Sequence, residues 1–185
     1  MDTPSYLIIP GWNNSGPGHW QTIWEENAPR QFRRVEQHNW TEPTKDDWVQ
    51  SLHESIELSD RPVVLVAHSL GCLTVVHWAK EFPGTHIVCA LLVAPADVES
   101  TERENFASFA PVPKHRLPFP TLVVASTNDP YAPIDKVARW AAHWGSKFVS
   151  IGNTGHINAA SKLGLWQQGL DLLARLAPVQ QPVLV

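Results

Sequence analysis

The sequence is poor in cysteine and in charged residues. Only two cysteines occur in 185 residues, Cys72 and Cys89, and each lies in an apolar stretch. Such a pair is typical of buried free thiols and not of a disulfide framework, which favours a reducing compartment. Charged residues make up 17% of the chain, below the roughly 25% of an average soluble domain. This composition argues for a compact body and against a long disordered arm.

Basic clusters and long apolar runs are missing as well. The chain carries 14 Lys and Arg against 18 Asp and Glu, for a net charge of −4, so a surface that binds nucleic acid is not expected. The longest mainly apolar run, Ile87 to Ala96, is far shorter than the roughly 20 residues that cross a bilayer. The segment Met1 to Pro4 shows no secretory signal. We therefore expect a cytoplasmic protein without nucleic-acid or membrane partners.

The length and the apolar pattern predict one α/β domain over residues 1–185. Short runs rich in β-branched residues alternate with segments of helical spacing, as in βαβ units. The expected strands are 6–9, 32–36, 63–67, 87–93, 121–125 and 148–151, and the expected helices are 19–27, 46–58, 70–82, 134–144 and 165–176. Val63 to Ala67 is continuously apolar, which favours a central parallel strand covered on both faces. The sequence therefore predicts three layers, with helices on both sides of a mostly parallel six-stranded sheet.

The sharpest motif follows this central strand. Ala67-His68-Ser69-Leu70-Gly71 is a small-x-Ser-x-Gly turn that leads from the strand into a helix. A serine in such a strained turn is exposed at the top of the sheet, and its small neighbours let helix and strands approach closely. The pattern usually has glycine where this chain has Ala67, which is a mild departure. The motif predicts a nucleophile elbow with Ser69 as the nucleophile.

A nucleophilic serine needs a base and an acid, which in this fold class follow it in the order acid, histidine. Asp129 comes after the expected strand 121–125, and the glycine-flanked His156 comes after the expected strand 148–151. All three side chains thus lie past the carboxyl ends of strands, where parallel sheets place their sites. We expect His156 to accept the Ser69 proton and Asp129 to orient the imidazole.

Other acids remain open at this point. Asp129 precedes Pro130 and could simply begin a turn. Asp97 also follows a strand end and is a rival acid, whereas Asp135 is better read as part of the first turn of a helix. Among the nine histidines, only His156 has the required position.

Backbone donors for the oxyanion are expected at two places. One is the N–H of Leu70, and the other is the N–H of Trp12 or Gly11 in the glycine-rich loop from Pro10 to Trp20. This loop has neither G-x-G-x-x-G spacing nor Gly-Lys-Ser/Thr, so it does not indicate a nucleotide site. Neither H-E-x-x-H nor paired cysteines occur, so neither a metal nor another cofactor is expected.

The motifs taken together resemble one family, the small α/β-hydrolases that include YdeN and retinoblastoma-binding protein nine. The resemblance covers nearly the whole chain and is carried by Ile8 to Trp12, His19-Trp20, Arg33 to Trp40, Val66 to Gly71, Leu92 to Asp97, Leu117 to Pro120, Ser126 to Tyr131 and Gly155 to Asn158. It implies a serine hydrolase with esterase activity on small esters and a triad of Ser69, Asp129 and His156. It also implies that Asp97 has no triad role.

We therefore expect an enzyme that hydrolyses small acyl esters, or else thioesters or amides, through an acyl-enzyme on Ser69. The alternatives are a binding protein that keeps the fold with little or no catalysis and an aminopeptidase or amidase. The chain leaves no room for a cap domain, so an open, shallow groove is expected. Its rims are expected to be the 10–20 loop, with Trp12, Trp20 and His19 as candidate substrate contacts, and the proline-rich 95–120 loop, with Phe106 and Phe109. Trp40 has no predicted place. Six further tryptophans are expected to cover the sheet, namely Trp24, Trp48, Trp78, Trp140, Trp144 and Trp166.

Overall fold

A parallel sheet forms the centre of the molecule. The computed structural model describes residues 3–100 and 104–177. Its strands are β1 (Ser5–Ile9), β2 (Phe32–Arg34), β3 (Val63–His68), β4 (Ile87–Val93), β5 (Thr121–Ala125) and β6 (Lys147–Ser150). All neighbours pair in parallel in the order β2-β1-β3-β4-β5-β6. The carboxyl ends of the strands therefore share one edge, and the loops that follow them meet there.

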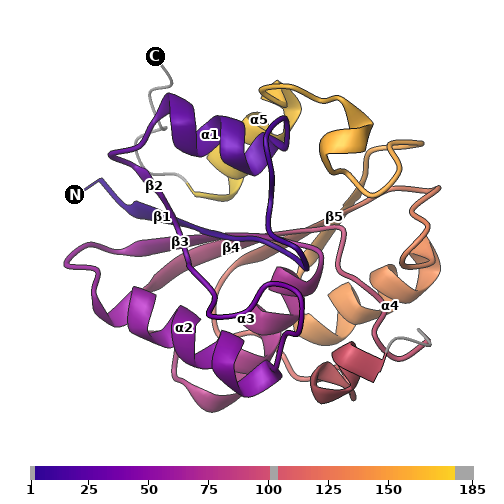
Figure 1. Cartoon of the computed structure of the whole chain (residues 1–185), viewed down its shortest axis with the longest axis horizontal. Coiled ribbons are helices and arrows are strands. Elements are labelled where there is room, and N and C mark those ends of the chain that lie inside the picture. Colours follow the sequence, from indigo (N-terminus) through magenta and orange to yellow (C-terminus); the bar gives the residue numbers. More distant parts are fainter. Residues whose placement is uncertain (1–2, 101–103, 178–185) are drawn as a thin grey trace.

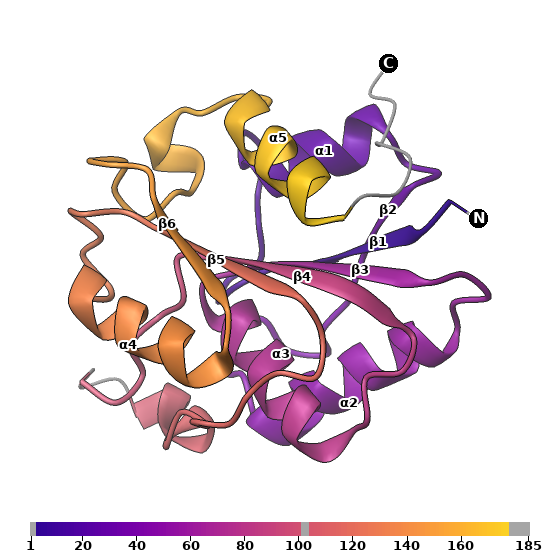
Figure 2. The ribbon, with the colours of Figure 1, turned by 180° about the vertical axis from the view of Figure 1, so that it is seen from behind.

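Helices cover both faces of the sheet, as predicted. The helices are α1 (Trp20–Asn27), α2 (Lys45–Glu57), α3 (Leu70–Glu81), α4 (Ile134–Trp144) and α5 (Gln167–Leu176), with 3₁₀ turns η1 (Glu104–Phe109) and η2 (Ala159–Ser161). α1 and α5 lie on one face, and α2, α3 and α4 lie on the other (Figures 1 and 2). The prediction of a three-layer α/β fold with a six-stranded sheet is confirmed.

The burial of β3 reflects its composition and its place in the sheet. Every residue of β3 is buried, because its continuously apolar side chains alternate between the two faces and each face has its own apolar core. The edge strand β6 is by contrast largely exposed. Cys72 and Cys89 are buried free thiols in these cores.

Local chemistry sets the ends of the helices. The Thr44 side chain accepts the Asp47 N–H at the start of α2, and Gly145 ends α4 in the left-handed conformation with φ of 66°. α5 begins two residues later than predicted, because Trp166 has a left-handed φ of 46° that does not fit a right-handed helix. β2 is shorter than predicted and ends at Arg34.

The proline-rich 95–120 segment is a long connection, as predicted, whose described part contains η1. Phe109 was expected at the rim of the site, but it is fully buried. Its ring packs against Trp48, with 5.9 Å between the ring centroids, and near His77. The expectation for Phe109 is therefore wrong, because η1 turns this side chain into the core under α2 and α3. In the described part of the chain, no helix is long and apolar enough to cross a membrane.

Candidate active site

Ser69 occupies a strained turn between β3 and α3. Its φ of 54° and ψ of −122° lie in a region that L-residues rarely adopt, as expected for a nucleophile elbow. Gly71 shows why the turn needs small neighbours. A Cβ there would lie 2.3 Å from the carbonyl oxygen of Ile9 and 2.5 Å from that of Pro10. The glycine therefore lets the start of α3 press directly against the end of β1.

Ser69, His156 and Asp129 form a continuous chain of hydrogen bonds. His156 Nε2 lies 2.8 Å from Ser69 Oγ, and His156 Nδ1 lies 2.8 Å and 3.0 Å from the two carboxylate oxygens of Asp129. A carboxylate can only accept, so Nδ1 carries the proton and Nε2 is free to accept one from the serine hydroxyl. The side chains of His156 and Asp129 are 8% and 4% exposed. The structure thus brings together the three side chains that the sequence singled out.

The loop that carries His156 is tied to the turn that carries Asp129. Ser126 Oγ accepts the N–H of Thr154 at 2.9 Å, and Asn128 Oδ1 accepts the N–H of Gly155 at 2.7 Å. Gly155 has a φ of 62°, which suits glycine. These contacts fix the imidazole and the carboxylate relative to each other.

Tyr131 was not singled out from the sequence, yet it touches the site twice. Its backbone N–H donates to Asp129 Oδ1 at 2.9 Å, and its ring packs edge-on against His156, with 4.5 Å between centroids. Its position two residues after Asp129 is a signal that could have suggested the first contact. The second depends on how the two loops meet.

The rival acids have other partners. Asp97 Oδ1 accepts from Lys136 Nζ at 2.6 Å, and Asp135 pairs with Arg139 one helical turn away. Burial raises the pKa of Asp97, but hydrogen bonds from Lys136 and Ser100 outweigh it and hold the pKa below its ordinary value. Asp97 therefore serves an ion pair in the wall of the cavity, and it is Asp129 that lies against His156.

The residues expected to donate to the oxyanion lie beside Ser69 and line the cavity above it. Leu70 opens α3, and the loop after β1 passes directly over Ser69. A Cβ on Gly11 would lie 2.7 Å from Ser69 Cβ and 3.3 Å from Leu70 N. Glycine at this position therefore keeps the space above the Leu70 N–H open. Trp12 follows Gly11, and its ring is fixed at the rim of the site by a hydrogen bond from Nε1 to the carbonyl oxygen of Thr41 at 2.9 Å.

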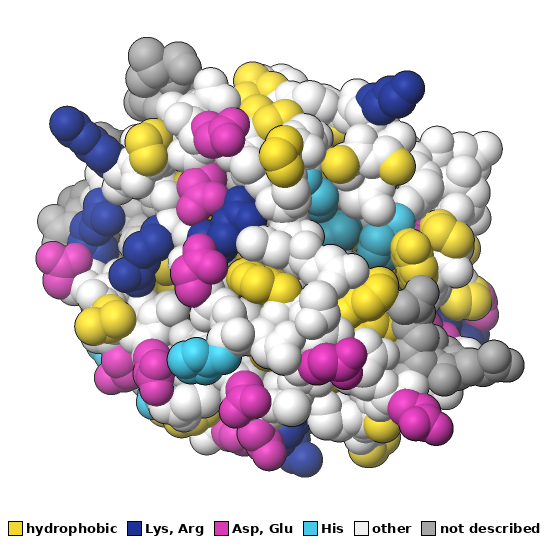
Figure 3. Space-filling view, in the orientation of Figure 1, with side chains coloured by type: hydrophobic (Ala, Val, Ile, Leu, Met, Phe, Trp, Pro, Cys, Tyr) yellow, Lys and Arg dark blue, Asp and Glu magenta, His cyan; other side chains and the backbone are white. Residues whose placement is uncertain are grey.

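A cavity of about 600 Å³ opens over the serine. Histidine side chains lie in this hollow and hydrophobic side chains rim it (Figure 3). Phe106 lines it from the 95–120 segment and packs edge-on against Trp12, with 5.6 Å between centroids. Besides Phe106, six other residues predicted for the site line the cavity, namely Gly11, Trp12, His19, Ser69, Leu70 and His156.

Trp20 was expected to contact substrate, but the structure places it elsewhere. Its side chain is 1% exposed and is absent from the cavity wall. It packs against Trp24 and Trp166, at centroid distances of 4.7 Å and 4.9 Å, in the layer between the sheet and the helices α1 and α5. The physical reason is that α1 begins at Trp20, which turns this ring toward the sheet.

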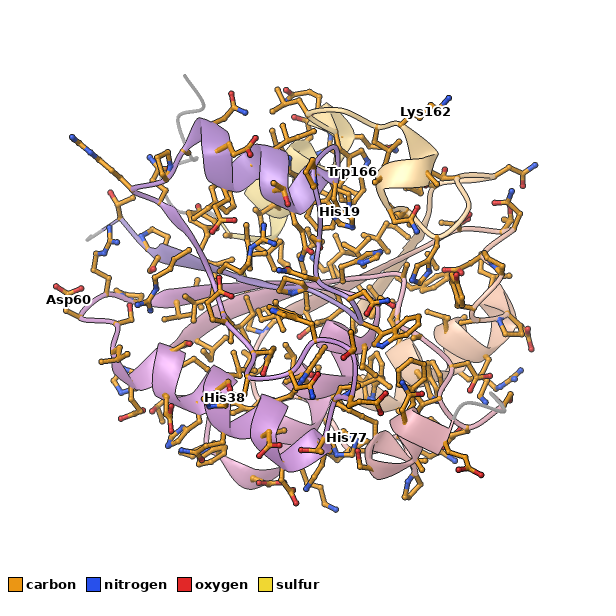
Figure 4. The ribbon with its side chains drawn as sticks, in the orientation of Figure 1. His19, His38, Asp60, His77, Lys162 and Trp166 are labelled. Carbon is orange, nitrogen blue, oxygen red and sulfur yellow. The ribbon has the colours of Figure 1, made fainter. Side chains whose placement is uncertain are left out.

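His68 lies beside His156, and His19 lies beside His68. The ring of His68 lies 4.7 Å from that of His19 and 4.8 Å from that of His156. Burial, together with the charges of Arg34 and His156, lowers the pKa of His19 from 6.5 to about 3, and burial also lowers the pKa of His68. Both are therefore neutral near pH 7. Figure 4 places His19 on the α1 and α5 side of the sheet, whereas His38 and His77 lie on the α2 and α3 side, away from the site.

The thiol nearest to Ser69 in the sequence is buried. Cys72 lies three residues after Ser69, but it is fully buried, and burial raises the pKa of its thiol well above the usual value. Within residues 3–100 and 104–177, no group of three or more His, Cys, Asp and Glu side chains is arranged to hold a metal ion.

Comparison with known proteins identifies the family. The sequence model of a family described as serine hydrolase matches residues 6–175. A comparison with curated proteins gives no match. A YdeN-like hydrolase from Pectobacterium atrosepticum is 31% identical with a TM-score of 0.85, over 95% of this chain and 91% of that one. Two more distant structures share the fold. The ydeN gene product of B. subtilis is 18% identical with a TM-score of 0.71, over 94% of this chain and 98% of that one. Mouse alpha/beta hydrolase domain-containing protein 10 is 18% identical with a TM-score of 0.68, over 95% of this chain and 91% of that one. The chain therefore belongs to the serine hydrolase family, as a small α/β-hydrolase of the YdeN type.

Proposed function

We propose that this hydrolase cleaves small acyl esters through a covalent acyl-enzyme on Ser69. The observation that carries the proposal is the hydrogen-bonded chain from Asp129 through His156 to Ser69, with 2.8 Å between His156 Nε2 and Ser69 Oγ. This is the geometry in which a serine hydroxyl can be deprotonated as it attacks. The neighbouring cavity of about 600 Å³ supports a substrate of small size.

Each step of the proposed reaction has a group to perform it. Ser69 Oγ attacks the ester carbonyl while His156 Nε2 accepts the hydroxyl proton and Asp129 stabilises the imidazolium. The carbonyl electrons form an oxyanion, which the N–H groups of Leu70 and Trp12 or Gly11 bind; each such donor contributes about 10²–10³ in rate. The intermediate collapses, and His156 gives its proton to the leaving alcohol. Water, deprotonated by His156, then attacks the acyl-enzyme, the carboxylic acid leaves and Ser69 regains its proton.

His19 is proposed as a polar contact for the substrate. Its Nδ1 accepts the backbone N–H of Gln21 at 3.2 Å, so the neutral ring carries its proton on Nε2. This buried Nε2 has no hydrogen-bond partner among the described residues, and His19 lines the cavity. Because this atom is buried, a substrate oxygen pairs with the donor only if the ring moves toward the cavity; the high cost of an unpaired buried donor favours that pairing. Trp12 and Phe106 supply the apolar part of the same cavity.

A substrate panel tests the proposal. Esters, thioesters and anilides of graded acyl length are assayed with the wild type and with Ser69→Ala. We expect short esters to be turned over by the wild type and kcat to fall by about 10⁴–10⁶ in Ser69→Ala. A folded wild type that is inert toward every substrate would contradict the proposal and favour a binding protein that retains the hydrolase fold.

A further inference from the structure

We propose that Trp20 is a positioning residue that holds His156 in place through the backbone next to it. The inference rests on the proposed catalytic role of His156. Trp20 Nε1 donates a hydrogen bond to the carbonyl oxygen of Ile157 at 2.8 Å, across 137 positions of sequence. Because Ile157 directly follows His156, this bond fixes the chain at the point where the imidazole leaves it.

The backbone conformation of Ile157 is strained and needs a hydrogen bond from outside the loop to stabilise it. Its φ is 51°, in the left-handed region that β-branched residues avoid because of the clash of Cβ with the backbone. The other hydrogen bonds of the loop hold its neighbours Thr154, Gly155 and Asn158, whereas the Ile157 N–H reaches the Thr154 carbonyl oxygen only at 3.4 Å. Without the indole donor, the strained residue would relax and carry His156 with it.

A second donor holds the preceding carbonyl. His68 Nε2 lies 2.9 Å from the backbone oxygen of His156, and an acceptor at this position means that Nε2 carries the proton. His68 ends β3 and precedes Ser69, so this bond ties the imidazole to the strand that presents the nucleophile. Two successive carbonyls, those of His156 and Ile157, are thus held by buried N–H groups from two different elements.

The direction of the Trp20 N–H is itself fixed. The ring is 1% exposed and packs against both Trp24 and Trp166, with centroid distances of 4.7 Å and 4.9 Å, and these two rings stack on each other at 5.9 Å. Trp166 follows the His156 loop along the chain and lies on the same side of the sheet as His19 in Figure 4. The aromatic cluster therefore acts as a rigid support, through which α1 restrains the loop after β6.

Trp24 provides a matched control in the same cluster. It is fully buried, and its Nε1 donates to a backbone oxygen at 2.7 Å, but that oxygen belongs to Leu165 and not to the His156 loop. Trp20→Phe and Trp24→Phe therefore remove the same kind of donor from the same apolar cluster. Only the first removes the bond next to His156.

The readout is the rate at which a small fluorophosphonate modifies Ser69, together with kcat and KM for a short ester and the melting temperature. We expect Trp20→Phe to lower the modification rate and kcat at least about tenfold with KM nearly unchanged, because a misplacement of about 1 Å can cost about 10²-fold. Trp24→Phe is expected to lose similar thermal stability and to keep wild-type rates.

Two results would overturn the inference: wild-type rates in Trp20→Phe, or equal rate losses in both variants. If Trp20→Phe does not fold, benzothienylalanine at positions 20 and 24 repeats the comparison, since it keeps the bicyclic shape and lacks the N–H. Failure of the proposed function gives a different pattern, because a folded wild type would then show no modification that depends on Ser69. If the wild type is modified at Ser69 and Trp20→Phe keeps the wild-type modification rate and kcat, only the positioning role of Trp20 is refuted.

Discussion

The buried His19 predicts a measurable loss of stability in mild acid. Burial, with the charges of Arg34 and His156, lowers the pKa of His19 from 6.5 to about 3. Below pH 6.5 the unfolded chain therefore binds a proton at this residue while the folded chain does not, so the free energy of unfolding falls as the pH falls. Each pH unit costs about 1.4 kcal/mol. At pH 5, which is 1.5 units below the unfolded value, His19 alone removes about 2 kcal/mol.

Urea unfolding of the wild type and of His19→Asn at pH 7.5 and pH 5 measures this contribution. Asparagine does not titrate, and its side-chain oxygen can replace Nδ1 as acceptor for the Gln21 N–H at the start of α1. The pKa of His68 is also lowered, chiefly by burial and less by the charge of His19; burial is common to both proteins, and loss of the smaller His19 effect in the variant changes its pH dependence in the same direction as the loss of His19 itself. We expect the free energy of unfolding of the wild type to fall by about 2 kcal/mol more than that of the variant. Equal decreases in the two proteins would refute the reasoning.

Three further predictions concern the acid, the elbow and the thiol. Asp129→Asn is expected to lower kcat by up to about 10⁴-fold through a misoriented imidazole, with Asp97→Asn close to wild type; a larger loss at Asp97 in ester kinetics would reverse the assignment. Gly71→Ala is expected to cost about 1–3 kcal/mol or more in urea unfolding, because its Cβ would lie 2.3 Å from the Ile9 carbonyl oxygen, and unchanged stability would refute that close packing. Cys72, buried with a raised thiol pKa, should react with thiol reagents only on unfolding; rapid modification with loss of activity would contradict this.

Much of the fold and of the candidate site follows from local signals in the sequence. The continuous apolar run at 63–67 predicts a central parallel strand, and β3 pairs on both sides as expected. Because all parallel strands end at one edge, three side chains that follow three strand ends lie at the same edge of the sheet, although β4 and β5 separate β3 from β6. The loops that follow β3, β5 and β6 bring Ser69, Asp129 and His156 into hydrogen-bond contact at this edge.

The direction of individual side chains could not be predicted in the same way. Trp12 and Trp20 occur in the same loop sequence, yet one lines the cavity and the other lies in the core. The difference arises because α1 begins at Trp20, and because its ring finds both an aromatic cluster and a carbonyl acceptor at Ile157. Phe109 is directed inward by η1 in a comparable way. These outcomes depend on contacts between segments far apart in the chain, on which local spacing carries no information.

The most direct test of the account is to identify the residue that a fluorophosphonate modifies. The folded wild type is incubated with the reagent, and the adduct is located by mass spectrometry, with Ser69→Ala as the matched control. The account predicts a single adduct on Ser69, loss of esterase activity in proportion to modification, and no adduct in Ser69→Ala. A folded wild type that stays unmodified, or an adduct that persists in Ser69→Ala, would contradict the role of Ser69 as the nucleophile.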